Sequence, residues 1–130
     1  MAHQSTETLV ADNLLAATMY PILYKTATIK SGAGQLKRGT VVGTGITTPA
    51  DPTATPPVEE VLDTSGKLVI APRGDLAYGV LAEDVDATSA DVVASVIICG
   101  AVQSEHLIVV SGSTAADFFD GLRRIGIFSI

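Results

Sequence analysis

The stretch LDTSGKLVIAPRGDLAYGVLAEDVDAT, residues 62–88, decides the fold class of this 130-residue chain. It contains two short apolar runs, residues 67–71 and 77–82, and each run follows a turn that contains glycine. Apolar runs of this length between turn residues are typical of β-strands. No residues in the stretch have the spacing of a catalytic motif. We therefore interpret it as a β scaffold that works through its surfaces.

Further strands are expected on both sides of this stretch. Residues 91–103 (DVVASVIICGAVQ) are rich in β-branched side chains and form the strongest strand candidate. Residues 26–30 and 36–42 flank the turn SGAG, and this arrangement predicts a hairpin across residues 25–42. Residues 125–130 (IGIFSI) are expected to form a last strand.

The best helix candidate is the segment TAADFFDGLRR, residues 114–124. Ser113 or Thr114 can cap the N-terminal end, and Phe118 and Leu122 are four positions apart and so share a face. Gly121 lowers the helix propensity and predicts a short helix. The chain is therefore expected to be mainly β with one or two short helices.

Two segments are expected to lack a core of their own. The first is an N-terminal arm, residues 1–24, in which Tyr20, Ile22 and Tyr24 would share a face if the chain is extended. Such an arm needs another surface on which to order. The second is the segment 43–57, which holds four of the six prolines and predicts a partly extended surface loop. The chain length favours one domain, residues 25–130, after the arm.

The composition limits the classes of function. A net charge of −6 argues against nucleic-acid binding, and 5% aromatic residues leave little for base stacking. With 47% hydrophobic and only 17% charged residues, part of the surface is expected to be covered by a partner or another copy. No stretch approaches the roughly 20 apolar residues of a membrane span. The first residues lack the pattern of a signal peptide, so a soluble protein made in the cytoplasm is expected.

The groups that could do chemistry are few, and each has a simpler structural explanation. The two histidines, His3 and His106, are far apart and there is a single cysteine, Cys99, so no zinc site is expected. Glu105 beside His106 could form an acid–base pair, but a surface turn is the simpler interpretation. The acidic run between residues 83 and 91 lacks the spacing of a calcium loop. We expect no catalytic residue, no metal and no cofactor.

The order of motifs along the chain resembles the bacteriophage lambda head decoration protein family. The motifs are LKRGTVVG (36–43), LDTSGKLV (62–69), AYGVLAEDVDATS (77–89), SEHLI (104–108) and RRIGIFSI (123–130). They span residues 36–130, about three quarters of the chain. The resemblance implies a small β-barrel or β-tulip-like domain with an extended N-terminal arm.

The resemblance also implies a function without enzymatic activity. Proteins of this family bind as trimers to the outside of an expanded phage capsid, at three-fold and quasi-three-fold positions. There they cement neighbouring major capsid proteins against the internal pressure of the DNA. The implied partners are the major capsid protein and two further copies of the chain, with no nucleic acid and no membrane, and the implied location is the outer surface of the virion. Two alternatives remain open, namely another phage structural role, such as a head fibre base or a tail-tube component, and a small enzyme using Glu105 and His106.

The resemblance assigns the contacts to two regions. An extended arm gains main-chain hydrogen bonds on the edge of a sheet, and its alternate side chains give specificity. The arm residues expected to bind the capsid are Leu9, Leu14, Leu15, Tyr20, Ile22, Tyr24, Thr26 and Thr28. The residues expected at a trimer or capsid contact near the last strand are Arg123, Arg124, Phe128 and Ile130.

Overall fold

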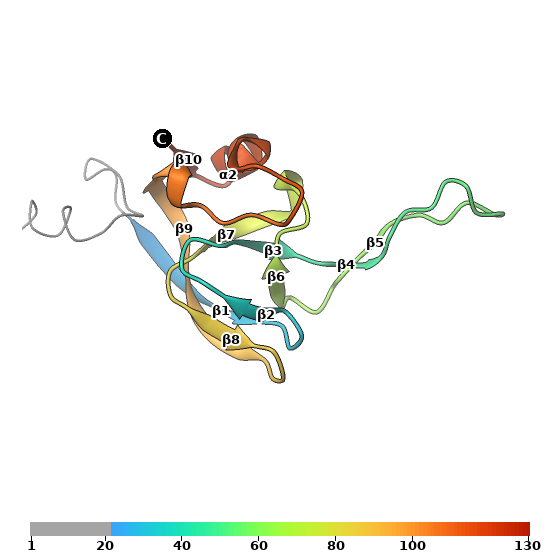
Figure 1. Ribbon diagram of the computed structural model, residues 1–130, viewed down its shortest axis with the longest axis horizontal. Coiled ribbons are helices and arrows are strands. Elements are labelled where there is room, and N and C mark those ends of the chain that lie inside the picture. Colours follow the sequence, from blue (N-terminus) through green and yellow to red (C-terminus); the bar gives the residue numbers. More distant parts are fainter. Residues whose placement is uncertain (1–21) are drawn as a thin grey trace, which may run out of the picture.

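Residues 22–130, described by the computed structural model, form a ring of strands with a short helix over one end and a long ribbon extending to one side (Figure 1). The strands are β1 (Leu23–Ile29), β2 (Gly34–Leu36), β3 (Val41–Thr44), β4 (Ile46–Thr48), β5 (Val61–Leu62), β6 (Leu68–Ile70), β7 (Ala77–Leu81), β8 (Val85–Ala87), β9 (Val92–Val102) and β10 (Ile127–Ser129). The helical segments are η1 (Gly74–Leu76), η2 (Ser104–His106), η3 (Ala115–Phe118) and α2 (Phe119–Arg124). The predicted fold class, mainly β with short helices, is confirmed.

Six strands form the main sheet in the order β1-β6-β3-β7-β9-β10. Strand β1 pairs with β6 on one side and with β9 on the other, which makes the sheet ring-like. Strand β9 is the longest, with 11 residues, as its run of β-branched side chains predicts. It pairs with β1, β7 and β10. The strands predicted at 67–71, 77–82 and 125–130 are present as β6, β7 and β10.

The hairpin predicted across residues 25–42 is wrong. Strand β1 pairs antiparallel with β9, from Ile29 opposite Val92 to Leu23 opposite Cys99. The segment 36–42 is divided between β2, which pairs with β8, and β3, which pairs with β6 and β7. The division falls at a turn in which the Thr40 N–H donates to the Lys37 carbonyl. Strand β9 is long enough to pair with all seven residues of β1, whereas β2 has only three.

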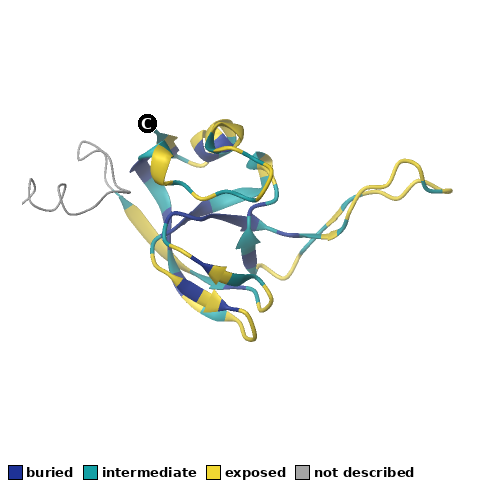
Figure 2. Ribbon diagram, in the orientation of Figure 1, coloured by how far each residue is buried: buried dark blue, intermediate teal, exposed yellow. Residues whose placement is uncertain are grey.

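The core consists of two apolar clusters, which appear dark blue in Figure 2. The first cluster lies under the helical segment and includes Phe118, Leu122 and Ile127, all with 0% exposure. The second cluster includes Ile29 and Val42 and fills the space between the ring and the β2–β8 pair. The four-residue spacing of Phe118 and Leu122 therefore identifies the buried face of the helical segment correctly.

The helical segment begins as a 3-10 turn, η3, and continues as the six residues of α2. At its start the Thr114 N–H donates to the Asp117 carboxylate over 2.8 Å. Gly121, which predicted only a weak helix, has a further role, because α2 crosses η1 at this residue. A Cβ at Gly121 would overlap the carbonyl oxygen of Gly74. The absence of a side chain at Gly121 is therefore required by the contact between the helix and η1.

Replacing Gly121 with alanine is expected to destabilise the protein, although alanine is the better helix former. The gain in helix propensity is about 1 kcal/mol, whereas overpacking of a close contact costs about 1–3 kcal/mol. The expected result is a lower midpoint of urea unfolding. The control is Asp120→Ala, one position earlier on the same helix and exposed, for which no loss is expected. A Gly121→Ala midpoint equal to or above that of the parent would contradict the role of the contact.

The surface loop predicted at 43–57 is correct only in part: residues 47–57 are mostly exposed, whereas Gly43 and Gly45 are buried and residues 43–44 belong to β3. The exposed part is also more ordered than a loop. Strand β4 pairs with β5, with Ile46 opposite Leu62 and Thr48 opposite Val61. A further bridge joins Asp51 to Val58 near the tip. We call residues 45–63 the ribbon. In Figure 1 it extends far from the ring of strands, along the longest axis of the molecule.

Ion pairs hold the base of the ribbon to the ring. The Lys30 ammonium lies 2.9 Å from the Asp63 carboxylate, which also accepts the Ser65 N–H over 2.8 Å. These two interactions lower the pKa of Asp63 to about 2. Arg73 forms a two-pronged contact with Glu60, with Nη2 at 2.6 Å from Oε1, and this contact holds the pKa of Glu60 below its ordinary value.

Acidification is therefore expected to release the base of the ribbon. A carboxyl group with a pKa below its unfolded value stabilises the folded state above the unfolded pKa, about 4 for Asp and Glu. That stabilisation is lost as the pH falls from about 4 toward 2. We expect the melting temperature to be nearly constant down to about pH 5 and to fall below it. In Asp63→Asn the fall should be shallower, and an identical fall in both proteins would contradict this assignment to Asp63.

Candidate functional site

The candidate site lies where the described chain enters the fold, beside the last strand. At the start of β1, Leu23 is paired with Cys99, and at the start of β10, Ile127 is paired with Gly100. A Cβ on Gly100, which has a φ of +133°, would lie 2.5 Å from Cδ1 of Ile22. Glycine at this position therefore lets Ile22 pack against the sheet, where it joins the first core cluster. The described chain thus enters the ring next to β10.

Exposed apolar side chains gather near β10. Phe119, Phe128 and Ile130 line a depression of about 470 Å³ together with Arg123. Their exposures are 38%, 43% and 65%. We call Phe119, Phe128 and Ile130 the terminal patch. Contiguous exposed apolar groups rimmed by polar residues are typical of interaction surfaces.

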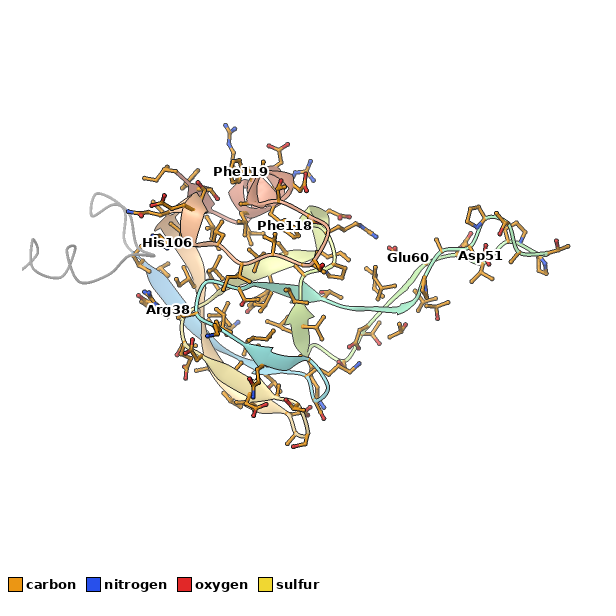
Figure 3. The ribbon with its side chains drawn as sticks, in the orientation of Figure 1. Arg38, Asp51, Glu60, His106, Phe118 and Phe119 are labelled. Carbon is orange, nitrogen blue, oxygen red and sulfur yellow. The ribbon has the colours of Figure 1, made fainter. Side chains whose placement is uncertain are left out.

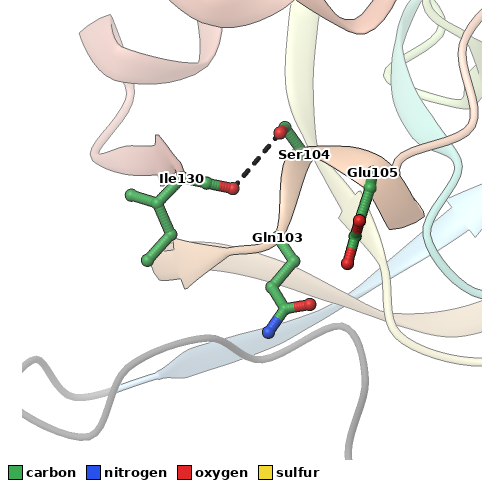
Figure 4. Close-up of a pocket in the computed structure, with 4 residues that line it drawn as sticks. All are labelled: Gln103, Ser104, Glu105 and Ile130. Atoms are coloured by element: carbon green, nitrogen blue, oxygen red, sulfur yellow. Dashed lines mark hydrogen bonds between the residues drawn. The ribbon is translucent and has the colours of Figure 1, made fainter.

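Hydrogen bonds fix the backbone under the terminal patch. The Ile130 N–H donates to the Val102 carbonyl over 2.9 Å, and the Ile130 carbonyl accepts the Ser104 N–H over 2.9 Å. The Ser104 hydroxyl also donates to this carbonyl over 3.2 Å, as the dashed line in Figure 4 shows. The main chain of Ile130 is therefore held in place while its side chain is exposed.

Strand β10 is also an open edge of the main sheet. No other strand of residues 22–130 pairs with its outer side. The backbone N–H and C=O groups of Ile130 point to the β9 side. These groups alternate in direction along a strand, so those of Ile127 and Ser129 point away from β9. The Ser129 hydroxyl is buried and has no hydrogen-bond partner in the described part of the chain. This edge can accept a further extended segment through main-chain hydrogen bonds.

The residues predicted for the arm fall into three groups. Tyr24, Thr26 and Thr28 lie in β1 at alternating positions, and Tyr24 and Thr26 are exposed. Ile22 packs against the core, just before β1. The remaining four, Leu9, Leu14, Leu15 and Tyr20, lie outside the described residues. Contact of any of these residues with a capsid stays a prediction.

The residues predicted near the last strand are brought close together. Arg123, Phe128 and Ile130 line the same depression, and Arg124 is exposed in the last turn of α2. The sequence interpretation missed Phe119. Adjacent residues on a helix point in different directions, so Phe119 must face outward if Phe118 is buried. Figure 3 labels both phenylalanines at the helical segment, where Phe118 has 0% exposure and Phe119 has 38%.

The side chains considered for catalysis or metal binding are either exposed to solvent or bonded to backbone groups of turns. Glu105 and His106 are 3.5 Å apart, but both side chains are exposed to solvent. Asp84 accepts the Arg38 N–H over 2.8 Å, and Asp91 accepts the Ser31 N–H over 2.8 Å. Within residues 22–130, no three His, Cys, Asp or Glu side chains are grouped as metal ligands would be. The acidic run between residues 83 and 91 thus stabilises turns.

No helix in residues 22–130 has the length and apolar character needed to cross a membrane. No curated protein matches the sequence. A family model described as bacteriophage lambda head decoration protein D matches residues 3–127, which is nearly the whole chain and includes the entry to β1, the ribbon and the helical segment, and ends at the first residue of β10. This chain therefore belongs to the bacteriophage lambda head decoration protein D family.

Proposed function

We propose that this chain binds the outer surface of an expanded phage capsid as a trimer, at three-fold and quasi-three-fold sites, and stabilises the capsid against internal DNA pressure. The observation that supports this most is the family match over residues 3–127. The family is structural, so we assign no catalytic role to any residue. The proposed partners are the major capsid protein and other copies of the chain, without nucleic acid or membrane.

The terminal patch and the start of β1 suit such a contact. The patch offers Phe119, Phe128 and Ile130 to an apolar surface, beside the place where residues 1–21 join the ring. The open edge of β10 lies next to it and can pair with an extended segment of a neighbour. We propose that residues 1–24 and the terminal patch contact the capsid lattice together.

Many weak contacts are sufficient for this task. A trimer that binds three equivalent surfaces turns the second and third contacts into intramolecular events, which raises the overall affinity far above that of one contact. The net charge of −6 suits a protein that lies outside the shell and has no contact with the packaged DNA.

The test is to mix the purified protein with expanded empty capsids and to image the particles. The proposal requires density at the three-fold and quasi-three-fold positions, in multiples of three copies, and a higher temperature of capsid disruption. The variant Ile130→Asp should bind at least about tenfold more weakly, a loss of about 1.4 kcal/mol, with Ile130→Val as the matched control. Absence of bound protein, or assembly of the protein alone into tubes, would refute the proposal.

A further inference from the structure

The ribbon reaches beyond the body of its own molecule. An extended residue spans about 3.3 Å, so the leg from Gly45 to the turn near Pro52 is roughly 25 Å long. A domain of about 100 residues has a radius of gyration of about 13 Å. In Figure 1 the ribbon points away from the ring and from α2. The tip therefore has no surface of residues 22–130 outside the ribbon within reach.

The direction of the ribbon is fixed at its base. Glu60 is held by Arg73, and Asp63 is held by Lys30 on the ring. The Asp63 N–H also donates to the Gly45 carbonyl over 2.9 Å, which joins the two legs where they leave the body. A ribbon anchored on both legs presents its tip in a defined direction.

No part of the ring or of the helical segment, as described for residues 22–130, covers the outer part of the ribbon. Val58 and Val61 are 40% and 50% exposed, and nearly every residue of the tip is exposed in Figure 2. A two-stranded ribbon without a third strand or a packed face is marginally stable in water. Its exposed valines and its length therefore indicate a contact with a second molecule.

The charges of the ribbon are all negative. It contains Asp51, Glu59, Glu60 and Asp63 and neither lysine nor arginine. Glu60 and Asp63 are used at the base, whereas Glu59 forms no ion pair with any residue of 22–130. Asp51 accepts the hydroxyl and the N–H of Thr53, which lower its pKa and keep it ionised. The outer part of the ribbon is thus acidic and partly apolar.

A complementary surface exists on the same chain but out of reach of its own ribbon. Arg123 and Arg124 are adjacent, exposed and in the last turn of α2. Neither forms an ion pair within the described residues. Ile125, which follows them, is 37% exposed and can contact the exposed valines of a ribbon.

We propose that the ribbon of one copy lies against the end of α2 in a second copy, with Asp51 and Glu59 facing Arg123 and Arg124. The two surfaces differ, so the contact is heterologous, and its repetition about a three-fold axis closes the ring of the proposed trimer. This inference specifies the self-association contained in the proposed function, but its test needs no capsid. Charge pairs of this kind contribute more to register and association rate than to affinity.

Cross-linking tests the contact directly. Two proteins are made in a Cys99→Ser background, one with Glu59→Cys and one with Arg124→Cys, and they are mixed with a short bis-maleimide. The expected result is a cross-linked dimer that contains one copy of each protein. The control pairs Glu59→Cys with Lys37→Cys, because Lys37 is an exposed cation away from α2. A yield no greater than that of the control would overturn the proposal.

Charge reversal provides a second, independent measurement. Glu59→Lys alone, or Arg123→Glu with Arg124→Glu, should raise the dissociation constant of the assembly at least about tenfold at low salt, as measured by sedimentation velocity. The protein that combines all three changes should recover most of the loss, and failure to recover would overturn the contact. If the two cysteine variants cross-link but the wild-type protein does not bind capsids, the proposed function fails and the ribbon contact stands. If the wild-type protein binds capsids but the two cysteine variants do not cross-link, the ribbon contact fails and the proposed function stands.

Discussion

Replacing Phe118 with alanine is expected to lower the free energy of unfolding by about 3–5 kcal/mol, the largest stability effect that we predict. Phe118 has 0% exposure and belongs to the cluster that joins the helical segment to the strands. Its removal leaves a cavity between α2 and β7 that the ring of strands cannot close. Since small domains are stable by only about 5–15 kcal/mol, the loss is large enough to be read from urea unfolding followed by near-ultraviolet circular dichroism.

The neighbouring residue provides the matched control. Phe119 is also a phenylalanine and lies in the same helical segment, but it is 38% exposed and belongs to the terminal patch. Phe119→Ala should change the free energy of unfolding by no more than about 1 kcal/mol, because its side chain is only partly removed from water. If this patch contacts the capsid, the same variant should weaken capsid binding. Similar losses of stability in both variants would show that the two faces of the segment are not distinct.

Local sequence patterns predict β6, β7, β9 and β10 well, because each of these strands corresponds to an apolar run in the sequence. The β-branched run at residues 91–103 forms β9, and the two apolar runs of the stretch 62–88 form β6 and β7. The spacing of Phe118 and Leu122 gives the buried face of the helical segment. Periodicity detects these features because they depend on side chains that are close together in the sequence.

The pairing of strands that are distant in the sequence cannot be inferred from local sequence patterns. The turn at residues 31–34 suggests a hairpin, yet β1 pairs with β9, about 70 residues away, because only β9 matches its whole length. The ribbon was missed for a related reason. Its prolines and threonines indicate exposure, but the pairing of β4 with β5 depends on Val61 and Leu62, which follow the proline-rich segment. The role of Gly121 depends on the approach of Gly74, which the sequence alone does not reveal.

The candidate site was predicted in part. Residues Arg123, Phe128 and Ile130 were singled out from the sequence and line one depression. What the sequence did not predict is that Ile22 and β10 meet at Gly100, so that the end of the arm and the terminal patch lie side by side. Strand β9 brings the two together, because its adjacent residues Cys99 and Gly100 pair with β1 and β10, respectively.

Deleting residues 1–21 is expected to abolish most capsid binding while leaving the fold and the self-association intact. The cut stops before Ile22, which packs against the core, and before Leu23, where β1 begins. If the removed segment forms the main-chain contacts proposed for it, the affinity for expanded capsids should fall roughly 100-fold, which is about 2.7 kcal/mol. The measurement is a binding isotherm on empty expanded capsids, with the melting temperature as a check on folding.

Two further deletions separate the contribution of the arm from that of β1. Deleting residues 1–8 removes a mainly polar segment and keeps Leu9, so it should retain nearly full affinity. Deleting residues 1–24 removes Leu23 and Tyr24 from β1 and leaves their partners on β9 unpaired, so it should also lower the melting temperature. If the 1–21 deletion binds as well as the full chain, the arm is not the main contact. The terminal patch and the free edge of β10 would then have to supply the binding energy, and Ile130→Asp should become the more damaging change.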